Sequence, residues 1–317
     1  MFMYIIKQPS KIIFGNQSAS QYEFPENCLL ITSKGAKQRG WIEYLGLKNF
    51  SIFNSVENNP SIKTVEKIFS KFSNSQISSV IGLGGGSVLD VAKFTAAKMN
   101  KSKILIPTTF GSGSEVTRIA VLKIDGKKQS FHNDDFFADT AIIDSNFILN
   151  TPEKVFKNSV IDALAQCSEG FDSKIGNFYT QVLCEKAFDY LESGLLTGDN
   201  EQIVLGSLLS GLGFGNCSTT LGHALSYVFS NEGIPHGHAL AFTTTISHKF
   251  NNSKFYSRFL TLVNKLNFEP IKLHSNFHDA AELILTDRKH LDNNPKPISH
   301  EDIVLLLEKI NSDSVLN

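Results

Sequence analysis

Two histidines and one aspartate of this chain have residue types and a spacing that suit a metal ion. His223 and His236 are thirteen positions apart, and the second stands in the tripeptide Pro-His-Gly. About sixty residues earlier, Asp162 and Gln166 stand four positions apart in a helical pattern, so their side chains share one helix face. A carboxylate, two imidazoles and an amide oxygen can together bind a divalent cation. Such an ion polarises a carbonyl oxygen and stabilises an alkoxide, which suits alcohol or aldehyde chemistry.

The same residues also have ordinary structural interpretations. Asp162 would then be an acid on a helix surface, and a single histidine is more often packed or solvated than bound to a metal. The combination, in a chain that also carries a nucleotide-like segment, favours the metal site. His238, two residues after His236, is the candidate for a catalytic proton relay. We expect the remaining histidines to lie on the surface, namely His132, His248, His274, His278, His290 and His300.

A glycine-rich turn follows an apolar run that is typical of a buried strand. Gly84, Gly85 and Gly86 end this run, and Ser87 opens a helical pattern. Bare backbone lets amide groups approach phosphate oxygens, and a helix N-terminus favours a negative charge. Ser87 can donate a further hydrogen bond and Asp90 can accept one, so we assign these five residues to a cofactor site. A plain strand–helix turn is the alternative, because a glycine turn is by itself a weak motif.

A second polar loop follows the next predicted strand, with Gly and hydroxyl residues between positions 107 and 117. Loops at the carboxyl ends of strands bind ligands in open α/β sheets, so Thr108, Thr109 and Ser112 join the cofactor site. Lys128 lies in a predicted hairpin and would reach a phosphate. A solvated loop and a solvated lysine are the alternatives. Two such loops on successive strands favour a nucleotide.

The composition argues against several classes of protein. The chain has 317 residues, of which 41% are hydrophobic and 19% charged, enough for two folded domains. A net charge of −1 gives no support for a nucleic-acid partner. The four cysteines form no CxxC pair, which suits a reducing cytosol. Neither a signal peptide nor a run of about 18 apolar residues is visible, so we expect a cytoplasmic protein without a membrane partner.

The first half of the chain alternates short β-like runs with helical patterns. This alternation predicts a Rossmann-like parallel sheet, covered by helices on both faces, over residues 1–150. Residues 119–131, broken by Asp125-Gly126, predict a hairpin. The predicted strands are residues 12–14, 28–31, 50–53, 79–83, 104–106 and 141–143, and the predicted helices are residues 36–45, 62–72 and 88–99.

From Thr151-Pro152 onward helical patterns dominate and strand candidates are nearly absent. Residues 151–317 are therefore predicted to form an all-α domain that carries the metal site, with a ligand cleft between the two domains. The predicted helices are residues 155–171, 179–191, 201–212, 221–229, 239–250, 279–285 and 300–310.

In these motifs the chain resembles the iron-containing (group III) alcohol dehydrogenase family. The resemblance begins at Pro9-Ser-Lys-Ile-Ile-Phe-Gly15 and continues through the glycine turn, the second polar loop and the Pro-His-Gly tripeptide. It implies a dehydroquinate synthase-like fold, bound NAD(P)H and a catalytic divalent metal, with Fe²⁺ favoured over Zn²⁺. It also implies that Asp162, His223 and His236 are metal ligands.

Two positions depart from the pattern of that family. Its fourth ligand, usually a histidine four residues after the aspartate, is Gln166 here, and an amide coordinates more weakly than an imidazole. A family histidine four residues after the first metal histidine is Tyr227 here. Together with Gly-Ile-Pro-His-Gly-His at residues 233–238, these replacements resemble the phosphonoacetaldehyde reductase branch. The site would then use three strong ligands with Gln166 or water, or it would bind its metal less tightly.

A third departure concerns the cofactor. Many members of the family have an aspartate after the second strand, where it accepts a hydrogen bond from the adenosine ribose. Ser33 takes that place here, with Lys34 and Arg39 nearby, so NADPH becomes acceptable beside NADH. The resemblance also implies that Asn59, within Asn58-Asn59-Pro60, belongs to the cofactor site.

Two classes of function follow. The first is a metal-dependent NAD(P)H oxidoreductase, expected to be a homodimer, that interconverts a small aldehyde and its primary alcohol, with phosphonoacetaldehyde as a candidate substrate. The second is a degenerate, non-catalytic nucleotide-binding protein. It is suggested by Gln166, by Tyr227 and by a helical domain that is short for the family between Phe250 and Asp279. Metal content separates the two. Lyase or synthase chemistry on this fold is less favoured, because those relatives use a glutamate as the first ligand.

Overall fold

The structure is a computed structural model that describes residues 3–149, 151–312 and 315. The chain divides into two compact units. The first spans Ile5–Thr151, and the second contains Pro152 and the residues that follow it. The first unit combines strands with helices, whereas the described part of the second is built from helices.

A parallel sheet of six strands forms the centre of the first unit, within residues 3–149. The strand order is β1-β8-β5-β4-β2-β3, and every neighbouring pair is parallel. β2 and β4 are buried along their whole length, as expected for strands that are covered on both faces. The predicted parallel sheet is therefore confirmed. Its strands are β1 Lys11–Phe14, β2 Leu29–Thr32, β3 Ser51–Phe53, β4 Ser79–Gly84, β5 Ser102–Pro107 and β8 Thr140–Ile143.

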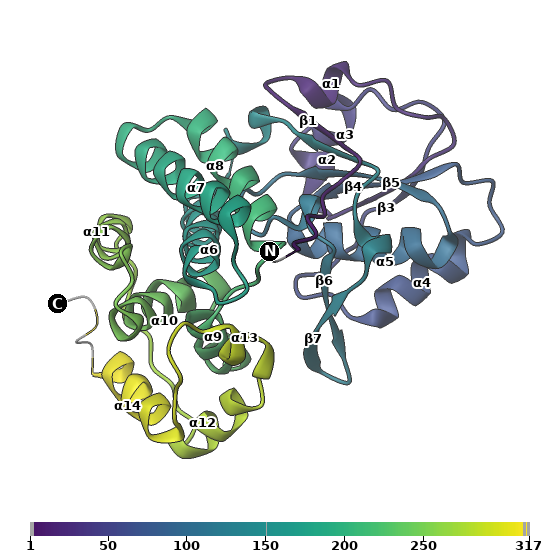
Figure 1. Ribbon diagram of the computed structural model, residues 1–317. Coiled ribbons are helices and arrows are strands. Elements are labelled where there is room, and N and C mark those ends of the chain that lie inside the picture. The colour runs from purple at the N-terminus through teal and green to yellow at the C-terminus, as the bar shows by residue number, and fades with distance from the viewer. Residues whose placement is uncertain (1–2, 150, 313–314, 316–317) are drawn as a thin grey trace. The chain divides into compact units, whose positions relative to one another are not determined.

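Helices cover both faces of this sheet, with α4 and α5 on one side and α1–α3 on the other (Figure 1). The predicted helix over residues 36–45 is in fact two short helices. Gly40 lies between them with a left-handed φ of 69°, which a continuous right-handed helix does not allow. The helices of this unit are α1 Ser18–Gln21, α2 Gly35–Gln38, α3 Trp41–Tyr44, α4 Ile62–Phe72 and α5 Gly86–Met99.

A separate antiparallel hairpin packs against α5 and projects from the sheet (Figure 1). It consists of β6 (Ile119–Ile124) and β7 (Lys127–His132). The turn residues Asp125 and Gly126 have φ values of 49° and 81°, the positive pair that a tight type I′ hairpin requires. The predicted hairpin is confirmed. Three 3₁₀ helices complete the unit, namely Ser114–Val116, Asp134–Phe136 and Ser145–Ile148.

The second unit contains helices and no strand within residues 152–312. Two of its helices, α11 and α13, lie where the sequence pattern predicted none. α13 is only six residues long, and six residues are too few to show a helical period. The helices are α6 Glu153–Asp172, α7 Phe178–Thr197, α8 Asn200–Phe214, α9 Leu221–Asn231, α10 His236–Asn251, α11 Tyr256–Leu266, α12 Phe277–Leu285, α13 Arg288–Asn293 and α14 His300–Asn311.

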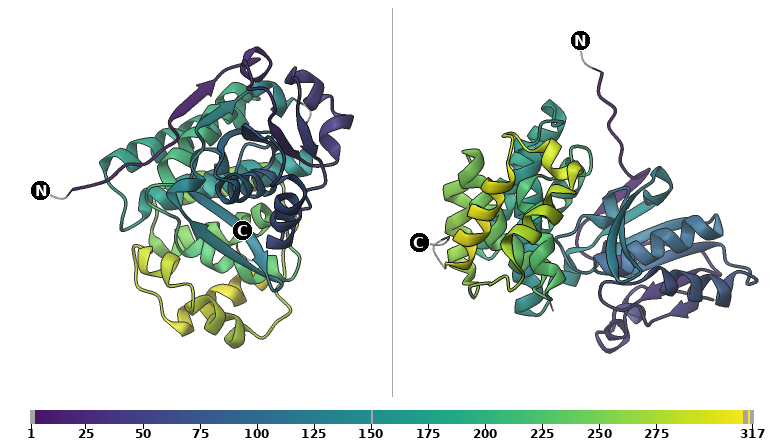
Figure 2. Two further views of the ribbon diagram at one scale, coloured as in Figure 1. Left: turned by 90° about the vertical axis from the view of Figure 1, so that its right-hand side faces the viewer. Right: turned by 90° about the horizontal axis from the view of Figure 1, so that it is seen from below.

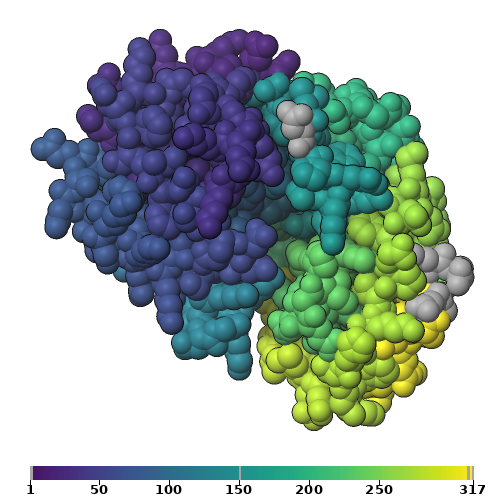
Figure 3. Space-filling model, turned by 180° about the vertical axis from the view of Figure 1, so that it is seen from behind, coloured from purple at the N-terminus to yellow at the C-terminus, as the bar shows by residue number. Residues whose placement is uncertain are grey.

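α6 is the central helix of this unit. It packs against α7, α8, α9 and α10, and almost every residue from Val160 to Gly170 is buried. Figure 2 shows this arrangement from two further directions. The later helices cover α9 and α10, and in Figure 3 the yellow-green residues beyond 250 lie beside the green residues of those two helices. Gln166, Ser168 and Glu169, the buried polar residues of this part of α6, therefore face neighbouring helices rather than bulk water.

No helix in the described part of the chain is long and apolar enough to cross a membrane. The most apolar helices of the second unit bury their side chains against each other instead. α8, for example, keeps nine of its residues buried, including Ile203, Leu208 and Phe214.

Candidate active site

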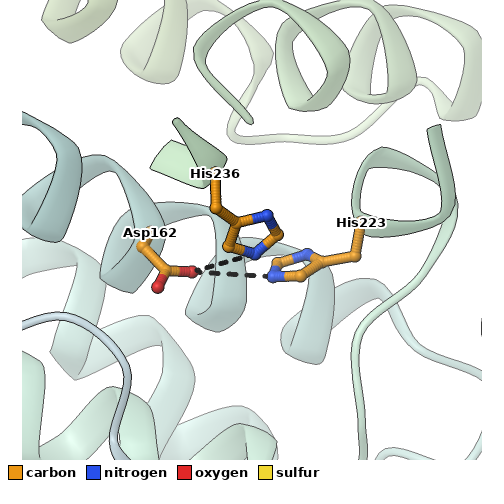
Figure 4. A group of neighbouring side chains, drawn as sticks. All are labelled: Asp162, His223 and His236. Atoms are coloured by element: carbon orange, nitrogen blue, oxygen red, sulfur yellow. Dashed lines mark ion pairs between the residues drawn. The ribbon is translucent and has the colours of Figure 1, made fainter. Parts of the chain in front are cut away.

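Three helices of the second unit bring Asp162, His223 and His236 together (Figure 4). Asp162 lies in the middle of α6, His223 is in the first turn of α9, and His236 is the first residue of α10. Their possible ligand atoms all lie within 4.8 Å of one another. Oδ1 of Asp162 is 3.7 Å from Nε2 of His223 and 3.9 Å from Nε2 of His236. Both distances are below about 4.1 Å, the span of two metal–ligand bonds, so one ion could contact all three groups.

A buried carboxylate fixes the orientation of His223. Oε2 of Glu169 lies 2.6 Å from Nδ1 of His223 and also accepts a hydrogen bond from the backbone N–H of Thr220 at 3.1 Å. The backbone N–H of Gly222 donates to the other oxygen of the same carboxylate. Because a carboxylate only accepts, Nδ1 of His223 carries the hydrogen, and Nε2 faces Asp162. Outer carboxylates hold metal-binding imidazoles in this way.

The charges of this pair stabilise each other in the metal-free protein. Burial alone lowers the pKa of His223, but its hydrogen bonds to Asp162 and Glu169 raise that pKa to about 9. Burial alone raises the pKa of Glu169, but the hydrogen bond and charge of His223 lower that pKa to about 2. The Glu169 carboxylate is therefore ionised, which suits a group that supports a metal-binding histidine.

Two glycines set the spacing of these helices. A Cβ on Gly222 would lie 2.8 Å from Cα of Thr244 in α10, and a Cβ on Gly237 would lie 2.6 Å from the carbonyl carbon of Asn158 in α6. Both distances are shorter than any ordinary contact of a side chain. His223 follows the first glycine and His236 precedes the second. Close approach of the backbones thus holds both histidines near Asp162.

Gln166 lies beside this cluster and is almost completely buried. Its Nε2 donates to Oδ1 of Asp162 at 2.9 Å, whereas its Oε1 is buried and has no hydrogen-bond partner in the described part of the chain. An unpaired buried carbonyl oxygen is costly, and a cation or a water bound to one would satisfy it. The cluster therefore fits a divalent ion with Asp162, His223 and His236 as its strong ligands.

His238 does not join the cluster. It lies two residues after His236 in α10, which turns its side chain by about 200° around the helix axis. Its Nε2 bonds to the carbonyl oxygen of Glu269 at 2.6 Å, and its ring packs on Phe268 with the centroids 5.2 Å apart. The geometry therefore does not support the predicted role of His238 as a catalytic proton relay.

In the first unit the two predicted cofactor loops lie side by side at the carboxyl ends of β4 and β5. The N–H of Thr108 donates to the carbonyl oxygen of Gly84 at 3.0 Å. A Cβ on Gly85 would lie 2.9 Å from Oγ1 of Thr109, and a Cβ on Gly86 would lie 2.9 Å from Oγ of Ser112. The glycines thus leave bare backbone beside two hydroxyls at the N-terminus of α5, an arrangement that suits an anion.

Neighbouring loops bring further predicted residues to this edge of the sheet. The N–H of Asn59 donates to Oγ of Ser87 at 3.3 Å. Ser33 directly follows β2, whose last residue, Thr32, pairs with Leu83 of β4. The guanidinium of Arg39 lies against Gly35, and its charge sits 4.9 Å from the ring centroid of Trp41. The positive charge of Arg39 therefore lies beside Gly35, which is two residues after Ser33 in the chain.

Two residues of the predicted cofactor set have other surroundings. Asp90 is buried and accepts hydrogen bonds from Oγ of Ser114 at 2.6 Å and from the N–H of Val121 at 2.9 Å. Its carboxylate therefore ties α5 to the hairpin instead of facing a ligand, which corrects the prediction. Lys128 lies on β7, opposite Lys123 of β6.

Comparison with known families decides the class of protein. Residues 9–145 match the model of the iron-containing alcohol dehydrogenases, and residues 156–284 match the C-terminal model of the same family. The chain belongs to the iron-containing alcohol dehydrogenase family. The predicted family and the predicted enzyme class, an iron-type alcohol dehydrogenase, are therefore confirmed.

Individual relatives of this alcohol dehydrogenase family differ in their substrates. The chain is 29% identical to the 4-hydroxybutyrate dehydrogenase of Clostridium kluyveri, over 79% of this chain and 83% of the relative. It is 30% identical to the 1-propanol dehydrogenase of Salmonella typhimurium, over 69% of this chain but only 65% of the relative. The structure of the sulfoacetaldehyde reductase of Bifidobacterium kashiwanohense with NAD⁺ is similar, with a TM-score of 0.88 at 23% identity over 99% of this chain and 100% of that one. That likeness shows the fold.

Sequence reasoning missed two residues of this alcohol dehydrogenase site. Glu169 lies seven residues after Asp162 and three after Gln166, so a polar stripe along a buried helix could have revealed it. His290 was expected on the surface but is buried, as is His248. His290 follows Asp287 by three residues in α13, and this acid–histidine spacing is the signal that could have revealed it.

Proposed function

We propose that this alcohol dehydrogenase family member reduces a small aldehyde to its primary alcohol, and catalyses the reverse oxidation, with NAD(P)H and a divalent metal held by Asp162, His223 and His236. The observation that carries the proposal is the convergence of these three side chains from α6, α9 and α10, with Glu169 behind His223. A bound Fe²⁺ or Zn²⁺ would polarise the aldehyde oxygen as a Lewis acid. We favour Fe²⁺, after the name of the family.

The protein's own residues prepare this chemistry. Glu169 holds His223 in one tautomer, so that Nε2 faces Asp162 without a rearrangement. Gln166 donates to Asp162 and leaves its carbonyl oxygen free for an ion or a water. Tyr227, whose pKa is raised by burial, stacks on His236 with the ring centroids 6.2 Å apart.

The glycine turn of the first unit is the proposed cofactor site. Its support is the bare backbone of Gly84, Gly85 and Gly86 beside Thr109 and Ser112, and the similar sulfoacetaldehyde reductase whose structure holds NAD⁺. The pyrophosphate of NAD(P)H would bind at the N-terminus of α5, where the backbone N–H groups and the helix dipole favour an anion.

The substrate is proposed at the level of a small aldehyde. The names of the relatives include 4-hydroxybutyrate, 1-propanol and sulfoacetaldehyde, so small alcohols and aldehydes of differing polarity occur in the family. Phosphonoacetaldehyde is our specific candidate, because Gln166 and Tyr227 replace two histidines in the pattern of that branch. A homodimer and a cytoplasmic location remain predictions.

The proposal is tested by the initial rate of NADH or NADPH oxidation with a panel of small aldehydes, phosphonoacetaldehyde among them. Protein loaded with Fe²⁺ or Zn²⁺ is compared with chelator-treated protein. We expect turnover that depends on the metal. A protein that binds cofactor but turns over no aldehyde when fully metal-loaded would instead be the degenerate nucleotide-binding member.

The place of Ser33 predicts how the cofactors are chosen. A serine does not repel a 2′-phosphate. The guanidinium of Arg39 lies beside Gly35, two residues after Ser33, and a guanidinium pairs well with a phosphate. We expect kcat/KM for NADPH to be at least comparable with that for NADH. Ser33→Asp should shift the ratio toward NADH by roughly tenfold or more, because a carboxylate repels the phosphate. Ser55→Asp, at an exposed serine, is the matched control. A strong preference of the wild type for NADH would contradict this prediction.

Gln166 predicts how tightly the metal binds. Gln166→His should add a strong imidazole donor four residues after Asp162 and lower the dissociation constant for Zn²⁺ by about tenfold or more. Gln166→Leu has a similar volume without a donor and should weaken binding. Calorimetric titration of both variants and the wild type checks the order. Equal affinities for all three proteins would show that side chain 166 does not face the ion.

A further inference from the structure

The segment between α8 and α9 leads directly into His223, the first metal-binding histidine. Its backbone supplies donors to the carboxylate of Glu169. Oε2 of Glu169 accepts hydrogen bonds from the N–H of Thr220 at 3.1 Å and from the N–H of His223 at 3.3 Å. The same oxygen lies 2.6 Å from Nδ1 of His223. The direction of the Thr220 N–H therefore bears on the carboxylate that holds the His223 ring.

Asn293, the last residue of α13, binds the opposite side of this segment. Its Nδ2 donates to the carbonyl oxygens of Cys217 at 2.8 Å and of Thr219 at 3.1 Å, and the residue is only 4% exposed. The carbonyl of Thr219 and the N–H of Thr220 belong to one peptide group, and in a trans peptide they point in opposite directions. Asn293 and Glu169 thus hold the same peptide plane from its two sides.

Further hydrogen bonds fix Asn293 itself. Its Oδ1 accepts from the N–H of Ile175 at 3.1 Å, and its backbone carbonyl oxygen accepts from the N–H of Lys174 at 3.0 Å. Both donors lie in the turn that follows α6, the helix of Asp162 and Glu169. A reversed side-chain amide would place its oxygen against two carbonyl oxygens, so this pattern determines the orientation of the amide.

The backbone before α9 has a conformation that needs such support. Ser218 has a left-handed φ of 61°, which is strained for any residue but glycine. If the peptide between Thr219 and Thr220 turned over, the carbonyl oxygen of Thr219 would face the carboxylate of Glu169. The N–H of Thr220, which is buried, would also lose its partner. The two hydrogen bonds from Asn293 oppose this rotation.

From this geometry we infer that Asn293 is a positioning residue of the metal site. It fixes the peptide between Thr219 and Thr220 so that the Thr220 N–H faces Glu169, and Glu169 in turn holds His223 in the orientation that a metal ion requires. This inference rests on the proposed function, because it assigns to Asn293 a part in the same metal site.

The test compares Asn293→Ala with Asn294→Ala, its matched control. Asn294 is also buried, and its side chain also makes three hydrogen bonds, but these join Asn251 and the carbonyl oxygen of Lys296. Both variants lose a buried amide, so both should melt at a lower temperature than the wild type. Only Asn293→Ala should weaken Zn²⁺ binding in a calorimetric titration, by about tenfold, the lower end for loss of a group that supports a metal ligand.

Hydrogen exchange of the Thr220 and Gly222 amides, followed by NMR on metal-free protein, tests the same inference without the ion. At equal intervals below the two melting temperatures, these amides should exchange faster in Asn293→Ala than in Asn294→Ala. Asn293→Ser is the milder variant if Asn293→Ala does not fold, since it keeps one hydroxyl donor. It should also bind Zn²⁺ less tightly than the wild type.

Equal Zn²⁺ affinity and equal amide exchange in Asn293→Ala and Asn294→Ala would overturn the inference. The proposed function would stand, because Asp162, His223 and His236 could still bind the metal without this support. A metal-loaded wild type that reduces no aldehyde would overturn the proposed function alone, since neither Zn²⁺ affinity nor amide exchange depends on turnover.

Discussion

Replacing His236 with alanine is expected to remove the bound metal and abolish aldehyde reduction, while NAD(P)H still binds. His236 supplies one of the three strong donors of the cluster, and Nε2 lies 3.9 Å from Oδ1 of Asp162. Without His236 the ion keeps two strong ligands. Loss of a residue that only supports a ligand lowers metal affinity by up to about 100-fold, so loss of a ligand itself should lower the affinity of the site for the metal by more than that. The side chain is 32% exposed, so the fold should tolerate its removal.

The measurement is metal stoichiometry after gel filtration, together with turnover and with the fluorescence change of NADH on binding. His238→Ala is the matched control, because it removes an imidazole two residues away that contacts Phe268 and Glu269 instead. It should keep its metal and most of its activity. Full metal content in His236→Ala would show that the ligand set is wrong, and the proposed function would lose its main support.

Gly237→Ala should destabilise the second unit and weaken metal binding together. The new Cβ would lie 2.6 Å from the carbonyl carbon of Asn158, so α6 and α10 must move apart at the point where they carry Asp162 and His236. Overpacking against a side chain costs about 1–3 kcal/mol. Because backbone atoms move less easily than a side chain, we expect the free energy of unfolding to fall by about 3 kcal/mol or more.

Thermal unfolding and metal titration of the same preparation check this prediction. Lys249→Ala changes an exposed residue of the same helix and should leave both quantities nearly unchanged. A Gly237→Ala protein that melts at the wild-type temperature and binds metal normally would show that the two helices are not in such close contact.

The sequence predicted those parts of the fold that leave a clear local pattern in the sequence, such as an apolar run or a helical spacing of apolar residues. β4 lies where a continuous apolar run predicted a buried strand, and α4 lies where helical spacing predicted a helix. The hairpin turn followed from Asp125-Gly126. The helix over residues 36–45 was wrong because Gly40 takes a left-handed conformation, which apolar spacing does not reveal. α13 was missed because six residues show no period.

The candidate site was predictable to a similar degree. Recognisable sequence motifs contain Asp162, His223 and His236, and the structure brings these three residues together. Glu169 and His290 lie in no motif, and their places beside His223 come from tertiary contacts between different helices. Asp90 shows the opposite error. It lies within a motif typical of phosphate binding, but its carboxylate accepts a hydrogen bond from Val121 of the hairpin instead. Spacing along a chain indicates which residues can meet, and packing decides which of them do.

The contacts at Gly222 and Gly237 also bear on how such a site can change over evolutionary time. They place the histidines through main-chain atoms, which a substitution elsewhere does not alter. The neighbouring positions 166 and 227 contribute to the site through their side chains, which in this chain are glutamine and tyrosine. The backbone thus keeps His223 and His236 in place while single side chains around them change. Metal preference and substrate choice can therefore change one substitution at a time without loss of the metal site.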